Sequence, residues 1–113
     1  RYADAAFMKY HPGIAKAWVC FNGVSTVSII NSHAISGVVR NAEGDYTATF
    51  TSALASAGFC AMGVTNRSNS GSNILALNVI SRSTTTCRFV IGEADTNNLL
   101  DSTYVTLIVW GDF

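Results

Sequence analysis

The sequence is short of charge. Only 12% of its 113 residues are Asp, Glu, Lys or Arg, about half of the ~25% found in ordinary soluble domains. The seven basic residues are balanced by seven acidic ones and lie scattered along the chain. Nucleic-acid binding needs a concentrated basic patch, so it is not expected. A surface with so little charge favours burial in an oligomer, contact with neutral partners such as sugars, or both.

Long apolar runs and cysteine motifs are missing as well. No segment approaches the ~20 apolar residues of a membrane span, and no secretory leader is recognisable, so membrane insertion is not expected. The three cysteines, Cys20, Cys60 and Cys87, are odd in number and widely spaced, which fits neither a disulfide framework nor a zinc motif. Since each lies in an apolar stretch, we expect buried free thiols and assembly in a reducing compartment.

Strand-like segments with turn residues between them dominate from residue 15 onward. Residues 1–14 differ, because His11-Pro12-Gly13 ends a helix-compatible stretch; they are expected to form an N-terminal arm or a linker to an upstream stalk. Residues 15–113 are expected to form one all-β domain, an antiparallel β-sandwich of jelly-roll-like type. Its eight strands are expected near 15–21, 26–31, 34–40, 45–51, 58–65, 73–81, 84–92 and 103–110.

Alternation within these segments predicts which side chains face the core. Tyr46, Ala48 and Phe50 share one face of their strand, with threonines on the other, as in a half-buried antiparallel sheet. The segment 104–110 is apolar on both faces, so it is expected to be central or to pack at a subunit interface. The two tryptophans are expected mainly in the core.

Catalytic and ligand-binding motifs are missing from the sequence. There is no Gly-x-Ser-x-Gly elbow, no phosphate-binding glycine loop and no metal-ligand spacing. The carboxylate pairs Glu43/Asp45 and Glu93/Asp95 flank predicted turns, where such residues commonly cap and solvate the chain. We therefore expect no enzyme activity, no catalytic residue, no cofactor and no metal. A metal held on a three-fold axis by one histidine per subunit would leave no such signature.

Two long polar loops, 66–73 and 92–102, are the candidate recognition surfaces, with flexible surface loops as the alternative. Their amides and hydroxyls suit sugar hydroxyls, ideally beside an aromatic platform such as Tyr104, Trp18 or Trp110. The candidate receptor-binding residues are Arg67, Ser68, Asn69, Ser70, Asn73, Asp95, Asn97 and Asn98.

Several motifs resemble a known domain. They are the segment Lys-Ala-Trp-Val-Cys-Phe-Asn-Gly at 16–23, Gly-Asp-Tyr-Thr-Ala-Thr-Phe-Thr at 44–51, the Phe-rich and Ala-rich stretch 50–63, His-Pro-Gly at 11–13 and Val-Trp-Gly-Asp at 109–112. Together they resemble the C-terminal domain of bacteriophage tail-fibre and related virion fibre proteins. The departures are small: Cys20 replaces a common polar residue, and a Gly-rich turn is shortened at residues 25–26.

The resemblance implies that residues 15–113 form a homotrimeric fibre tip on a virion, assembled in the host cytoplasm and joined to an upstream fibre shaft. It implies binding to a bacterial surface glycan or outer-membrane protein during adsorption. It carries over no functional residue. A purely structural role, as a trimerisation cap, capsid fibre or decoration protein, is the alternative, and a glycan depolymerase is a more remote one.

Overall fold

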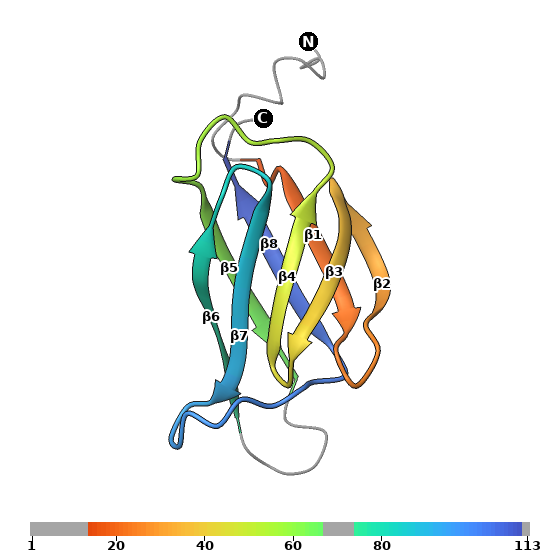
Figure 1. Cartoon of the computed structure of the whole chain (residues 1–113), viewed down its shortest axis with the longest axis vertical. Coiled ribbons are helices and arrows are strands. Elements are labelled where there is room, and N and C mark those ends of the chain that lie inside the picture. The colour runs from red at the N-terminus through yellow and green to blue at the C-terminus, as the bar shows by residue number, and fades with distance from the viewer. Residues whose placement is uncertain (1–13, 67–73, 112–113) are drawn as a thin grey trace.

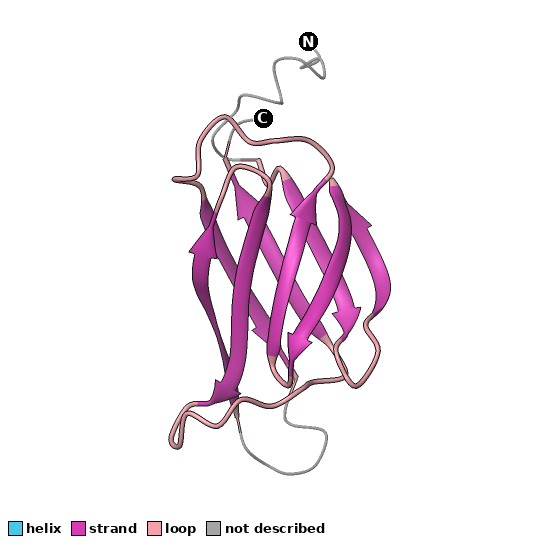
Figure 2. Cartoon of the chain, in the orientation of Figure 1, coloured by secondary structure: helices cyan, strands magenta, loops and turns pink. Residues whose placement is uncertain are grey.

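The computed structural model describes residues 14–66 and 74–111, and all regular structure within them is β-strand (Figure 2). The expected eight-strand antiparallel sandwich is confirmed. Residues 1–13 of the expected arm lie outside the described part of the chain. The strands are β1 (Ala17–Asn22), β2 (Ser28–His33), β3 (Ile35–Ala42), β4 (Asp45–Phe50), β5 (Cys60–Thr65), β6 (Leu75–Arg82), β7 (Thr86–Glu93) and β8 (Val105–Trp110).

The strands form two four-stranded sheets that face each other (Figure 1). The β1 sheet has the order β2-β1-β8-β5, and the β4 sheet has the order β3-β4-β7-β6. Every neighbouring pair is antiparallel. The apolar strand β8 lies centrally in its sheet, between β1 and β5, which confirms the first of the two positions expected for it.

The core lies between the two sheets and is aromatic at its centre. Tyr46, Phe89 and Phe21 are fully buried, with ring centroids 5.1 to 6.0 Å apart, the spacing of favourable aromatic pairs. The alternation expected in β4 is confirmed, because Tyr46, Ala48 and Phe50 all point into this core.

The expectations for cysteine and tryptophan are wrong in part. Of the three cysteines, all of which the structure describes, Cys87 is buried, Cys20 is partly exposed and Cys60 is exposed. Trp18 and Trp110 are also partly exposed rather than core residues. The reason is strand alternation: β1 and β8 each bury one set of alternate side chains, so the intervening set points outward.

The connections gather at two ends of the sandwich because successive strands run in opposite directions (Figure 1). The lower end comprises connections 23–27, 43–44 and 94–104 together with residues 66 and 74. The upper end comprises residues 14–16, residue 34, connections 51–59 and 83–85, and residue 111. Six-residue strands span about 20 Å, so the two ends are separated by about that distance.

Candidate functional site

A tight turn over residues 93–98 stands at the lower end, directly after β7. The Glu93 N–H donates to the Asn98 carbonyl at 2.9 Å, and the Asn97 N–H donates to the Glu93 carbonyl at 3.0 Å. Asn97 has a φ of 63°, a left-handed conformation that Asn tolerates better than most residues. Leu99 then pairs with Gly92 in an isolated β-bridge. The turn therefore folds back onto the strand that it leaves.

This fold-back is close because residue 92 lacks a side chain. A Cβ at Gly92 would lie 3.0 Å from the Asn98 carbonyl oxygen and 3.2 Å from the Leu99 side chain, which is tighter than ordinary packing. A larger residue would push the turn away from β7. The sequence thus fixes the position of the turn against the outer face of the β4 sheet.

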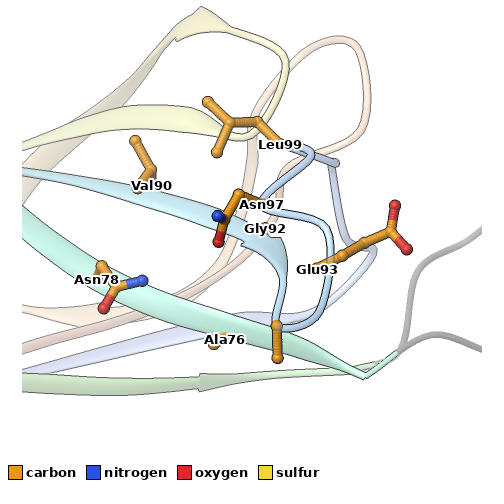
Figure 3. Close-up of a pocket in the computed structure, with 8 residues that line it drawn as sticks. Ala76, Asn78, Val90, Gly92, Glu93, Asn97 and Leu99 are labelled. Carbon is orange, nitrogen blue, oxygen red and sulfur yellow. The ribbon is translucent and has the colours of Figure 1, made fainter.

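A depression of about 320 Å³ lies between this turn and strands β6 and β7 (Figure 3). This volume is at the lower end of the range for small-ligand sites. Asn78 comes from β6 and Asn97 from the turn, while the Glu93 carboxylate points away from the other labelled side chains. The residues that line it are Ala76, Asn78, Val90, Gly92, Glu93, Ala94, Asn97 and Leu99.

The lining combines small apolar side chains with two carboxamides. Val90 and Leu99 offer aliphatic surface, and the amides of Asn78 and Asn97 each provide donors and an acceptor. Neutral hydroxylated ligands suit this combination, because their C–H faces contact aliphatic groups and their hydroxyls exchange hydrogen bonds with amides. We call this depression, with its eight lining residues, the lower pocket.

A buried carboxylate anchors the crossover from the turn to β8. Asp101 accepts hydrogen bonds from the Tyr46 hydroxyl at 2.6 Å, the Gly44 N–H at 2.8 Å and the Arg40 Nη2 at 2.9 Å. Burial is the largest single influence on the pKa of Asp101 and favours its neutral form, yet the hydrogen bonds together hold that pKa below its ordinary value. The crossover is therefore tied to the core by an ionised side chain.

Neighbouring contacts extend this anchor into the β1 sheet. The Gly23 N–H donates to the Ser102 carbonyl at 2.9 Å, and the Tyr46 hydroxyl lies 2.8 Å from the Gly23 carbonyl. Every buried side-chain nitrogen or oxygen in residues 14–66 and 74–111 has a hydrogen-bond partner. The turn thus projects from a fixed base.

A second ion pair involves Asp45, which belongs to the carboxylate pair Glu43/Asp45 noted in the sequence. Arg88 donates to Asp45 from Nη2 at 2.6 Å and from Nε at 3.0 Å, and the Asn41 amide adds a bond of 3.1 Å. The hydrogen bond from Arg88 is the main reason that the pKa of Asp45 lies below its ordinary value. The geometry thus gives Asp45 a structural partner across β4 and β7.

The structure brings only some of the expected site residues together. Asp95, Asn97 and Asn98 share the turn, and of these Asn97 lines the lower pocket. Five further candidates lie outside the described residues: Arg67, Ser68, Asn69, Ser70 and Asn73. The residue after that segment is nevertheless close to the turn, since the Ala94 N–H donates to the Ile74 carbonyl at 3.5 Å.

The expected aromatic platform is not at the lower pocket. Trp18 and Trp110 lie on the outer face of the opposite sheet, and Tyr104, just before β8, is 41% exposed. In turn, the sequence did not single out Asn78, Val90 or Leu99 as lining residues. The alternation of Val90 within its strand was visible, but the meeting of these residues depends on the pairing of β6 with β7 and on the return of Leu99 to Gly92.

The described residues contain neither a metal-ligand cluster nor a membrane-spanning helix. No three His, Cys, Asp or Glu side chains gather there to hold an ion, and no helix in that part of the chain is fit to cross a bilayer. Comparison of the chain with protein-family models, curated proteins and solved structures found no match.

Proposed function

We propose that the chain is the receptor-binding tip domain of a bacteriophage tail fibre, working as a homotrimer. One observation carries this proposal: the two ends of the sandwich differ, since the chain enters at one end and the lower pocket lies at the other. Residues 14–16 lead into β1 at the upper end, while the lower pocket and its turn lie about 20 Å away at the lower end. A domain attached to a shaft through its upper end would present the lower end to a host cell.

The ligand class that suits the lower pocket is a neutral glycan of the bacterial surface. Asn78 and Asn97 provide hydrogen-bonding amides, and the small apolar lining accepts the C–H face of a sugar. The turn is fixed by Asp101 and by Gly92, so ligand binding need not order it, which lowers the entropic cost of recognition. An outer-membrane protein as receptor would need a broader contact than this depression.

The test is binding to immobilised lipopolysaccharides and capsular polysaccharides from a panel of bacterial strains. Asn97→Gly is the sharpest variant, because Gly accepts the φ of 63° and only the amide is lost. A neutral hydrogen bond is worth about 1 kcal/mol, so we expect at least about fivefold weaker binding. Thr84→Ala, an exposed change at the upper end, is the control and should bind as the wild type does.

Two results would contradict the proposal. One is the absence of binding to every polysaccharide in the panel, and the other is equal binding by wild type and Asn97→Gly. The same samples distinguish a depolymerase, since cleavage would generate new reducing ends or unsaturated sugars, whereas a binding tip releases its glycan unchanged.

A structural virion component is the second candidate, and the uncharged outer face of the β1 sheet favours it. Such a domain would work by association alone. Replacing residues 95–98 with Gly and Ser would then leave adsorption and host range unchanged. A change in host range would favour the receptor-binding tip instead.

A further inference from the structure

Charge is distributed unequally between the two sheets. None of the residues of β1, β2, β5 and β8 is Asp, Glu, Lys or Arg. Every strand of the β4 sheet contains at least one: Arg40, Asp45, Arg82, Arg88 and Glu93. The outward side of the β1 sheet therefore lacks the charges that normally keep a sheet surface solvated.

Apolar side chains occupy this outward side in rows across the strands. Trp18 pairs with Ile108, and Ile108 pairs with Met62. In the adjacent rows Val64 pairs with Thr106, and Cys60 pairs with Trp110. Met62 and Val64 are 57% and 65% exposed. We call this surface, the outward side chains of β1, β8 and β5, the apolar face.

We propose that the apolar face is the contact surface between copies of this chain. The inference rests on the proposed function, since a trimeric tip needs such a surface. Interface cores are enriched in Trp and Met and depleted of charge, and this face carries Trp18, Trp110 and Met62 with no charged residue in its strands. Around a three-fold axis each copy can turn this face inward, so that one part of the face meets a different part of the same face on the next copy. A face without Asp, Glu, Lys or Arg makes that contact without repulsion between like charges.

The charge of the rest of the chain favours a second copy, rather than a highly charged partner, as the molecule that covers the apolar face. The chain as a whole has a formal net charge of zero, so copies do not repel one another at long range. The Arg40–Asp101 and Arg88–Asp45 pairs are neutralised within the chain. A highly charged partner would find no complementary charge in the strands beneath the apolar face.

The area of the face sets the strength expected of the contact. Three strands about 4.8 Å apart and about 20 Å long cover roughly 300 Å² in projection. Two such faces bury about 600 Å², below the ~1,200–2,000 Å² of standard interfaces. We therefore expect weak association of the free chain, which would strengthen when an upstream shaft holds the copies together and raises their effective concentration.

The first test is sedimentation equilibrium of the 113-residue chain from about 10 μM to about 500 μM, a range that brackets weak interfaces. The mean mass should rise from 12.0 kDa toward three times that value. Met62→Lys and Val64→Lys should abolish the rise. Val39→Lys is the matched control: Val39 is 59% exposed, on β3 of the other sheet, and its variant should associate as the wild type does.

Tryptophan fluorescence supplies a second readout at the same surface, because both tryptophans of the chain lie on the apolar face. Acrylamide quenching should fall as concentration rises in the wild type and Val39→Lys, and should stay constant in Val64→Lys. Protection of monomeric chain by phosphatidylcholine vesicles would instead identify lipid as the occupant and overturn the inference.

Other results separate this inference from the proposed function. A chain that binds polysaccharide yet remains at 12.0 kDa at all concentrations would overturn the inference alone. Equal disruption by Val39→Lys and Val64→Lys would also overturn it. A chain that associates through the apolar face but binds no polysaccharide would leave the inference standing and contradict receptor binding.

Discussion

Removing the hydroxyl of Tyr46 is expected to destabilise the fold from its lower end. This hydroxyl lies 2.6 Å from the Asp101 carboxylate and 2.8 Å from the Gly23 carbonyl, and the Tyr46 side chain is fully buried. In Tyr46→Phe the ring packing stays, but the single phenolic proton that these two acceptors share is removed from a buried position. The substitution thus isolates the polar anchor from the aromatic core.

The magnitude follows from the charge of the acceptor. A hydrogen bond to an ionised group contributes about 1.5–3 kcal/mol, and Tyr46→Phe leaves the buried Asp101 carboxylate with one donor fewer. We expect a loss of about 2–3 kcal/mol in the free energy of unfolding. At roughly 4 °C per kcal/mol for a domain of this size, the midpoint of thermal unfolding should fall by roughly 8–12 °C.

Urea unfolding measures this loss, with the m-value expected to be unchanged since both proteins expose the same surface. Tyr104→Phe is the matched control: the same atom is removed from a ring that is 41% exposed, so its cost should stay within about 0.5 kcal/mol. A double-mutant cycle with Asp101→Asn should show coupling. Equal costs for Tyr46→Phe and Tyr104→Phe would refute the reasoning.

Three further predictions concern pH, backbone and thiols. The pKa of Asp101 is lower in the folded protein than in the unfolded chain. The ionised carboxylate therefore stabilises the fold above the unfolded pKa of about 3.9, and this contribution is lost as pH falls toward the folded pKa. Acid titration should therefore destabilise Asp101→Asn less than wild type. Gly44→Ala should cost more than about 2 kcal/mol in urea unfolding, because φ is +69° and a Cβ would lie 2.6 Å from a carbonyl oxygen, whereas Gly37→Ala has nothing within 4 Å and should be nearly neutral. Iodoacetamide with mass mapping should label exposed Cys60 rapidly and Cys87 only on unfolding, since burial raises the pKa of the Cys87 thiol to about 11.

Strand positions were predictable because they depend on local alternation. The pattern of Tyr46, Ala48 and Phe50 identifies an inward face without reference to any other strand. The apolar composition of β8 predicted either a central position or one at a subunit interface, and the sheet topology places the strand centrally in its sheet. The order of strands within each sheet was not predictable, because pairing joins segments far apart in the chain, such as β1 with β8.

The same distinction, between local alternation and contacts of distant segments, explains which sequence-based predictions were wrong or missing. Trp18 was assigned to the core from its hydrophobicity, although its neighbours Ala17 and Val19 occupy the inward positions of β1. The role of Asp101 was invisible because its donors Arg40 and Tyr46 lie 61 and 55 residues away. The lower pocket likewise needs the turn to return onto β6 and β7. Polar loops could be found from composition, but not the surface that one of them completes.

Competition for adsorption tests receptor contact at the lower end most directly. The proposal that this chain is a fibre tip is tested by mixing a phage whose fibre carries this sequence with its host, in the presence of purified chain at saturating concentration. The account predicts that wild type and Thr84→Ala slow adsorption, whereas Asn97→Gly at the same concentration competes less. Adsorption that is unaffected by saturating wild-type chain, or slowed equally by Asn97→Gly, would contradict it.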